Sequence, residues 1–567
     1  MNGQESERSM ESESIWNKYS PTFTPWFESE FTYEGWGKAT FENPIGTVEG
    51  KTKISVDELG NLNAKMEYEL LETEAVIDES FETFRLMKFL HRSLDKNGHL
   101  SIGLSDTNIN PCSKLIVQTK EGVFASEGNI SWIKFDLSNN VLFYLNQGTF
   151  EIENGETPKY WIVPLSNFIS TFHFNRYAPL NRHPLRQYTT PLVPEFKEDQ
   201  QRQTALLAAN SRNHLISFSF GKKVGFIEPL PDYKEKKGKL ESGQFRQCPT
   251  ALMISEVTDD INDIWFPQIY ANLLSFASGA EVSALWLEIR DKTGKLVRRR
   301  HFPTLKSSYE KGYAVIIESL HEGTGNLISV ASESPDFLKT YFRILLTHLV
   351  QINSNTQHLE NNMTILSRTF EGLSVEFGLG KQILKDYLSD SDKEEVALIL
   401  NEAKNKIQKL INQAKKGEEF DASASLQRIK SKIENANNTD GDFGLKVNDL
   451  LKMYELPDAL IMEQYYSQQA DGNEKSWISF LSQIRNAPIH KGYFEVGNNT
   501  YNSDELRIVQ NHLHDILVRI VLKTLGYEGE YQPKVIGHWA DGKTANWVTE
   551  KTSATELGYR KRGVHDN

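Results

Sequence analysis

The chain has 567 residues, of which 39% are hydrophobic and 25% are charged, and its formal net charge at pH 7 is −13. This composition is that of a folded protein and excludes wholesale disorder, and the length predicts roughly three or four structural units. Two cysteines are too few for a disulfide framework or a cysteine-based zinc site, and the acidic balance confines any nucleic-acid binding to local basic patches.

The sequence predicts no targeting signal at its N-terminal end. Residues 1–15 are polar and acid-rich, which predicts a disordered tail and not a secretion signal. The apolar stretch around residues 516–522 is interrupted by Arg519 and followed by Lys523, so it falls short of the ~20 apolar residues that span a bilayer. We therefore expect a cytoplasmic protein with no membrane partner.

Residues 16–194 are rich in β-branched and aromatic runs separated by turn pairs, which predicts antiparallel hairpins. We expect a sandwich or barrel-like β-domain here, ending at a proline-rich connection over 175–194. The predicted strands are 114–119, 132–137, 141–146 and 160–165, and the predicted turns are Gly60-Asn61, Asn97-Gly98, Asn139-Asn140 and Asn154-Gly155.

Residues 195–333 have a mixed, β-rich pattern, with a hairpin turn at Thr293-Gly294 and predicted strands over 214–220, 284–290 and 313–319. The pattern leaves open whether this region is separate from the first domain. A helical period begins after Ser334 and Pro335, a predicted N-cap and first-turn proline. We expect an all-helical domain over 334–530 and an irregular tail over 531–567, and hence an α+β fold.

The helical region predicts at least seven helices. The clearest are a helix from 474 to about 486 with an apolar face, and a long last helix that starts after Ser503 and stops at Gly526. The others cover 336–352, 356–377, 392–415, 425–437 and 442–454.

The candidate catalytic residues lie at the end of the helix that begins at 474. Arg485 is followed directly by Asn486, and His490 comes four residues after Asn486, a spacing that places the last two on one face of a regular helix. Pro488 between them would end or kink the helix and re-aim His490. Such a polar cluster can face a cleft or a partner helix.

This segment, RNAPIHKGYF, resembles the HEPN superfamily, whose ribonucleases carry an Arg, a polar residue, a short spacer and a His in a helical bundle. The segment LSRTFEGL, with Arg368 and Glu371, is similar to an early bundle helix of these proteins. Length and the β-rich N-terminal part make the whole chain resemble ApeA-like abortive-infection proteins, which act against phages.

The resemblance implies a metal-independent endoribonuclease with no cofactor, in which Arg485, Asn486 and His490 act on RNA, with transfer RNA as a candidate substrate. His490 would move a proton near neutral pH, and Arg485 would neutralise the charge that builds on phosphorus. One chain supplies one motif histidine, so a homodimer or higher homo-oligomer is implied. The resemblance also implies a phage-derived activator, so the enzyme would be inactive before infection.

Other charged residues are weaker candidates. Glu371 either holds the site by pairing with Arg368 or Arg485, or forms an ordinary surface salt bridge. Lys491 and the basic run Arg298, Arg299 and Arg300 are candidate RNA contacts, although most charge runs are simply solvated.

Two other functions remain open from the residues alone. The first is a non-catalytic HEPN bundle that binds nucleotides or RNA and dimerises. The second is a carbohydrate- or protein-binding β-domain whose helices only oligomerise. Only the enzyme hypothesis makes the effect of the protein on cell growth depend on His490.

Overall fold

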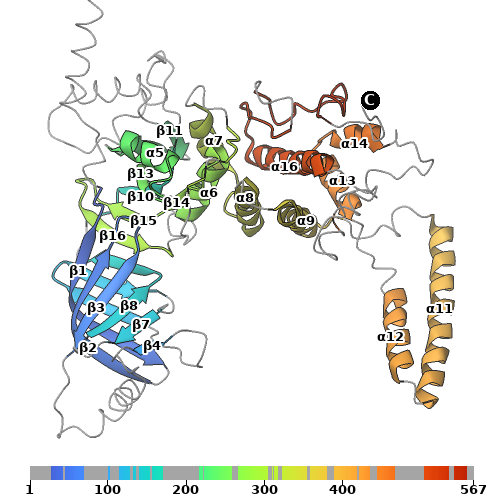
Figure 1. Ribbon diagram of the computed structural model, residues 1–567, viewed down its shortest axis with the longest axis horizontal. Coiled ribbons are helices and arrows are strands. Elements are labelled where there is room, and N and C mark those ends of the chain that lie inside the picture. Colours follow the sequence, from blue (N-terminus) through green and yellow to red (C-terminus); the bar gives the residue numbers. More distant parts are fainter. Residues whose placement is uncertain are drawn as a thin grey trace, which may run out of the picture. The chain divides into compact units, whose positions relative to one another are not determined.

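The computed structural model divides into two compact units, each described by itself (Figure 1). Unit 1 comprises residues 1–338, 353–355 and 524–530, and unit 2 comprises 339–352, 356–523 and 531–567. The structure describes residues 27–42, 45–68, 100–102, 114–127, 132–135, 140–153, 156–169, 216–220, 223–230, 232–257, 266–303, 309–310, 312–316, 322–353, 358–379, 389–417, 420–434, 443–466, 485, 503–535 and 542–558.

Unit 1 is built on a large antiparallel sheet. The order of its described strands is β11-β12-β13-β10-β15-β16-β9-β6-β5-β1-β2-β3-β8-β7-β4, with β14 paired to β10. The strands are β1 (Phe31–Glu42), β2 (Ile45–Val56), β3 (Leu62–Tyr68), β4 (Leu100–Ile102), β5 (Lys114–Thr119), β6 (Gly122–Ser126), β7 (Trp132–Phe135), β8 (Asn140–Leu145), β9 (Gly148–Ile152), β10 (Tyr160–Ser166), β11 (Ile216–Phe220), β12 (Lys223–Pro229), β13 (Pro249–Glu256), β14 (Ser283–Ala284), β15 (Trp286–Arg290) and β16 (Leu296–His301).

The hairpin β15–β16 joins the two predicted β-rich regions into one sheet. β16 pairs with β9 and β15 pairs with β10, so the predicted hairpin at Asn154-Gly155 is wrong: the strands on either side of that turn are separated by the inserted hairpin. The predicted turn at Thr293-Gly294 does connect β15 to β16, with Gly294 at φ +87°, a conformation that glycine adopts without steric cost.

Alternating side chains of β1, β2, β3, β5, β6, β8 and β9 form one hydrophobic core, because successive residues of a strand point to opposite faces. Tyr33, Ile54, Met66, Val117 and Phe143 are among its buried residues. A second cluster, around Ile162, Leu252 and Ile254, covers the β10–β13 part of the sheet. The predicted strands over 114–119, 132–137, 141–146, 160–165, 214–220 and 284–290 are present in whole or in part, whereas residues 313–316 form no strand.

Unit 1 also contains helices α5 (Tyr233–Glu241), α6 (Phe266–Ser278) and α7 (Glu322–Glu333). Helix α7 corrects the prediction that the helical period starts after Ser334. Ser334 follows the end of α7 and its backbone N–H still donates to Val330 and Ala331, so Ser334 lies at the end of one helix and not at the start of another.

The described helices of unit 2 are α8 (Thr340–Asn353, whose last residue falls in unit 1), α9 (Leu359–Glu376), α11 (Asp390–Lys416), α12 (Phe420–Glu434), α13 (Phe443–Met453), α14 (Asp458–Tyr466) and α16 (Ser503–Leu525, whose last two residues fall in unit 1). The sequence predicts all of these helices except α14. The helix expected over 474–486 lies outside the described residues except for Arg485, which is helical. No described helix is long and apolar enough to cross a bilayer. The fold class is α+β, with a β-rich N-terminal region followed by helices.

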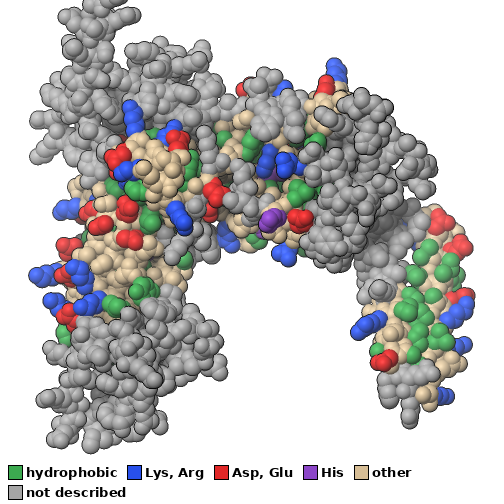
Figure 2. Space-filling view, viewed as in Figure 1, with side chains coloured by type: hydrophobic (Ala, Val, Ile, Leu, Met, Phe, Trp, Pro, Cys, Tyr) green, Lys and Arg blue, Asp and Glu red, His purple; other side chains and the backbone are tan. Residues whose placement is uncertain are grey.

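Helices α11 and α12 pack against each other as a hairpin. Hydrophobic side chains remain visible along its surface (Figure 2), and the exposed ones include Leu398, Ile399 and Leu410 on α11 and Ile429 on α12. Among the described helices of unit 2, α11 has the most exposed large hydrophobic side chains.

Candidate functional site

The candidate site is built around an ion pair between two helical segments of unit 2. Arg485 Nη2 lies 2.5 Å from Glu371 Oε1, and the two side chains are 27% and 31% exposed. The sequence offered two partners for Glu371. The structure pairs it with Arg485, and the described residues show no ion pair between Glu371 and Arg368.

Glu371 is held in place because α9 is anchored on several sides. Met363, Leu366, Phe370 and Leu373 form a buried stripe at helical spacing, and the Phe370 ring packs edge-on against Phe443 of α13 with ring centroids 6.1 Å apart. At the start of α9, Gln510 of α16 donates to the Leu359 carbonyl at 2.6 Å. A carboxylate on so fixed a helix gives Arg485 a defined position.

A histidine that sequence analysis did not single out lies on the neighbouring helix α8. His348 Nδ1 is 2.7 Å from Thr369 Oγ1, two residues before Glu371 on α9. Burial, together with the nearby positive charge of Arg368, lowers the pKa of His348, so the imidazole is neutral at neutral pH. Arg368 is exposed. The sequence around His348 contains no motif that would have marked it.

Three of the predicted site residues are not placed. Asn486, His490 and Lys491 lie outside the described residues, so in unit 2 the geometry covers Arg485, Glu371 and Arg368 among the predicted site residues. The distances from the motif histidine to the arginine therefore stay predictions.

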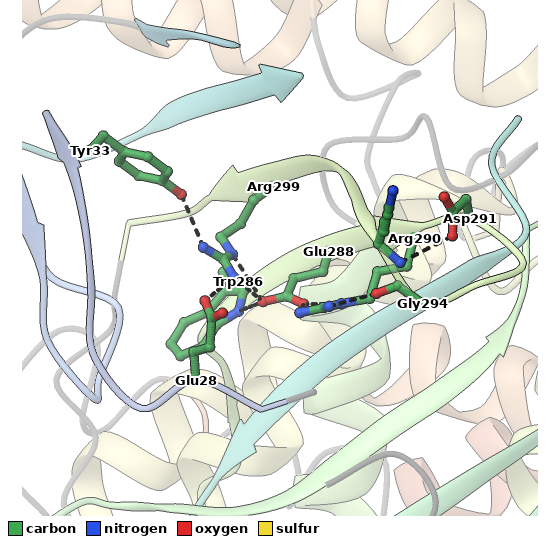
Figure 3. A network of polar contacts seen from close by, with 9 residues as sticks. Glu28, Tyr33, Trp286, Glu288, Arg290, Asp291, Gly294 and Arg299 are labelled. Carbon is green, nitrogen blue, oxygen red and sulfur yellow. Dashed lines mark hydrogen bonds and ion pairs between the residues drawn. The ribbon is translucent and has the colours of Figure 1, made fainter. Parts of the chain in front are cut away.

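The basic run on β16 is divided between the interior and the surface. Arg299 is buried and forms an ion pair with Glu288 (Nη2 to Oε1, 2.8 Å) and with Glu28 (Nη2 to Oε2, 2.9 Å), as Figure 3 shows. Its guanidinium also lies over the Phe31 ring at 3.7 Å. The prediction that Arg299 contacts RNA is therefore corrected: its charge is neutralised inside the sheet and is inaccessible to phosphate.

The neighbours of Arg299 have different surroundings. Arg300 is partly exposed and pairs with Glu127 at 3.0 Å, and Arg298 is partly exposed. The carboxylate that holds Arg299, Glu288, also accepts from Arg290 Nε at 2.7 Å and from Trp286 Nε1 at 3.0 Å. Burial alone would raise the pKa of Glu288, but the two guanidinium groups outweigh it and lower that pKa, so the network is a charged structural element.

A second ionic network, which sequence analysis missed, lies wholly inside unit 2. Asp458, at the start of α14, contacts Arg519 of α16 and lies 2.5 Å from His512 Nε2. Arg519 Nε lies 3.3 Å from Asp515 Oδ2, which also accepts from the Tyr531 hydroxyl at 3.1 Å. All five side chains are buried, and the network ties α14 and the tail after residue 530 to α16.

The two acids of this network differ in proton affinity. Burial would raise the pKa of Asp458, but Arg519 and His512 together hold it well below its usual range. Burial raises the pKa of Asp515 to about 6, and the more distant pull of Arg519 and His512 offsets this only in part. Arg519 and His512 together therefore outweigh the effect of burial on the pKa of Asp458. For Asp515 they offset burial only in part.

Part of this network could have been found from the sequence. His512, Asp515 and Arg519 are three and four residues apart, which places them on one face of a helix whose second half is mainly apolar. Three ionisable groups on a buried face require partners. His512 and the nearby His514 are both buried. The partner Asp458 is 54 residues from His512 and has no sequence signal.

The arrangement around Arg485 has the chemistry of an anion site. A guanidinium carries five N–H donors in a planar fork, and the contact with Glu371 helps to fix the orientation of the Arg485 side chain. Comparison of the chain with known protein families, with curated proteins and with solved structures gives no match. The chemistry of the site therefore rests on its own residues and on the motif.

Proposed function

We propose that this protein is a metal-independent endoribonuclease of the HEPN type, with Arg485, Asn486 and His490 as its catalytic residues. The observation that carries the proposal is the contact of Arg485 with Glu371 on α9. The motif arginine is joined to the same helix that the resemblance singled out, and it is partly exposed, whereas Arg299 and Arg519 are buried among carboxylates.

The proposed reaction needs no metal. The ribose 2′-oxygen attacks the adjacent phosphorus, the bond from phosphorus to the 5′-oxygen breaks, and a 2′,3′-cyclic phosphate and a 5′-hydroxyl form. His490 either takes the 2′-hydroxyl proton or protonates the departing 5′-oxygen, and Arg485 donates to the phosphoryl oxygens as their charge increases. Glu371 is a positioning residue, because it acts through Arg485.

The acid and the base come from two copies of the chain. A two-fold arrangement brings two copies of Arg485 and His490 into one groove, which is why the proposed enzyme is a homodimer or a higher homo-oligomer. Single-stranded loops, such as those of transfer RNA, have the flexible backbone that in-line attack needs. By the resemblance to ApeA-like proteins, the trigger is a phage-derived activator and the outcome is abortive infection.

The test is cleavage of total cellular RNA by the purified full chain in EDTA, with and without extract from phage-infected cells. Arg485→Ala and His490→Ala are compared with Arg428→Ala, which removes an exposed arginine of α12. We expect fragments with 2′,3′-cyclic phosphate ends from the unchanged chain and from Arg428→Ala, and a loss of about 100-fold or more from the other two.

Two results would overturn the proposal. Equal cleavage by all four proteins would remove the motif from the chemistry. RNA that is bound but stays intact in both conditions would favour the alternative, a non-catalytic HEPN module that binds RNA or nucleotides.

A further inference from the structure

Helix α11 has two apolar stripes, although α12 is the one described helix that packs closely against it. The stripe toward α12 contains Leu400, Ile407 and Ile411. The other contains Ile399 and Leu410, which are 59% and 48% exposed. These two residues are 11 positions apart, about three turns, so their side chains lie within about 20° of each other around the helix. A helix with one neighbour needs one stripe, and the second is left without a partner among the described residues.

Both ends of α11 are defined by capping residues, so the second stripe lies on a regular helix. Ser389 caps its start by accepting from the Asp392 backbone N–H at 3.2 Å, and Gly417 follows its end after Lys415 and Lys416. The acids of the first turn and the bases of the last turn match the helix dipole.

The charges beside the second stripe are ordered along it. Glu402 follows Ile399, and Lys406 and Lys409 precede Leu410; all three are exposed, and none of them forms an ion pair with another described residue. The stripe therefore has an acidic residue nearer its start and basic residues nearer its end. Its apolar residues lie at both ends of this charged stretch.

This order makes the stripe complementary to itself in an antiparallel arrangement. If Ile399 of one α11 lies against Leu410 of another, Glu402 of the first lies between Lys406 and Lys409 of the second, and the two-fold axis repeats both contacts. A parallel arrangement would oppose Glu402 to Glu402 and Lys406 to Lys406, which electrostatics disfavours. The charge pattern thus selects both the partner and its direction.

We propose that the exposed stripe of α11 binds a second copy of this chain, antiparallel, so that two α11–α12 hairpins form a four-helix contact. Burial of Ile399 against Leu410 supplies an apolar contact at each end of the interface, and Glu402 with Lys406 sets the direction. The inference stands apart from the proposed ribonuclease activity, because it uses no residue of the Arg485 site.

The test uses two charge reversals in the full chain, Glu402→Lys and Lys406→Glu. Each alone opposes like charges twice across the two-fold axis, and we expect the Kd for self-association to rise by about tenfold or more. When the two single variants are mixed, both contacts between positions 402 and 406 again join opposite charges, so a heterodimer should form with an affinity close to that of the unchanged chain. Sedimentation velocity at a series of concentrations measures both.

The mixture separates a contact between copies from a change within one helix. Glu402 and Lys406 are four residues apart, so each single reversal also removes an attraction within the helix; mixing leaves that loss in place and restores only the contact between copies. Asp390→Lys and Lys415→Glu change the same charges on roughly the opposite face of α11 and should leave the Kd unchanged. Circular dichroism of every variant checks that the helices persist.

The outcomes are distinct. A dimer formed elsewhere, including one around Arg485, shifts the mass of all variants equally and leaves the comparison intact. The inference is overturned if the single reversals associate with the same Kd as the unchanged chain. It is also overturned if mixing the two variants does not restore that Kd. RNA cleavage is a separate measurement, so a failure of the ribonuclease proposal would not affect this result.

Discussion

Two arginines of unit 2 contact carboxylates, but one arginine is buried and the other is partly exposed to solvent. Arg519 is fully buried and contacts Asp458 and Asp515, whereas Arg485 is 27% exposed and contacts Glu371. A buried charge cannot be left without its partner except at high cost. A partly solvated pair contributes little to stability and can exchange its carboxylate for a phosphate.

The comparison shows how burial separates structural ion pairs from candidate sites. Arg299 in unit 1 belongs with Arg519, because it is enclosed by Glu288, Glu28 and the Phe31 ring. Its sequence neighbour Arg300 is partly exposed. Each of these arginines contacts a carboxylate, so exposure is the property that decides which arginine can meet a ligand.

The strongest test of the comparison is Arg519→Ala. The substitution leaves Asp458 and Asp515 buried without their cation, and we expect the free energy of unfolding to fall by about 3–5 kcal/mol. Urea denaturation followed by circular dichroism measures it. Arg507→Ala, which removes an exposed arginine from the same helix, is the control and should change stability by less than about 0.5 kcal/mol. Equal effects would show that the network is dispensable.

Adjacent residues of β16 provide the same contrast in unit 1. Arg299→Ala removes one of the two guanidinium groups that neutralise buried Glu288, and we expect a loss of roughly 3 kcal/mol. Arg300→Ala breaks a partly exposed pair with Glu127 and should cost less than about 1 kcal/mol. Thermal unfolding of both variants gives the difference, and similar melting temperatures would contradict the distinction.

The buried network also predicts a pH dependence. The pKa of Asp515 is about 6 in the folded chain, against 3.8 for a free side chain. A raised pKa in the folded state means that this acid's stabilising contribution is complete below pH 3.8 and is lost as the pH rises through about 6. An asparagine side chain cannot ionise, so Asp515→Asn should become more stable relative to the unchanged chain by roughly 2–3 kcal/mol between about pH 4 and pH 7.

Asp458 serves as the internal reference for this measurement. Its pKa is lowered, so its contribution is present above pH 3.8 and is lost as the pH falls below that value, in both proteins alike. Denaturant unfolding at a series of pH values gives the difference curve. A constant difference between about pH 4 and pH 7 would mean that Asp515 titrates normally.

Much of the fold could be predicted because its signals are local. Runs of β-branched and aromatic residues predicted β5 and β10. Apolar residues at helical spacing predicted α9, α11 and α16. The insertion of β15–β16 between β9 and β10 could not be predicted, because pairing between strands so far apart in the sequence depends on which edges meet in three dimensions. Helix α14 was missed because it is short and lacks one apolar face.

The candidate site was predictable only in part. The pairing of Glu371 with Arg485 was one of the alternatives that the sequence offered, because a motif arginine needs a partner, yet the residues are 114 positions apart and Arg368 was an equal choice. The burial of Arg299 had no sequence signal: β16 contains a basic run, and only the neighbouring strand β15 supplies the buried Glu288 that neutralises it.

The expected stability effect of Arg485→Ala is also small, and it decides what the Glu371 contact means. Because both side chains are partly solvated, we expect the free energy of unfolding to change by less than about 1 kcal/mol, measured by the same urea series as Arg519→Ala. Under the ribonuclease proposal the same variant loses RNA cleavage while it keeps its stability. Arg519→Ala, in contrast, should lose stability and activity together.

Glu371→Gln sharpens this result, because it keeps the size of the side chain and removes its charge. If Glu371 only positions Arg485, the variant should keep its stability within about 1 kcal/mol and lower kcat more than it raises KM, since the guanidinium is still present but less well oriented. A loss of more than about 2 kcal/mol for Arg485→Ala would place this pair with the buried networks, and the exposure of Arg485 would then have no bearing on catalysis.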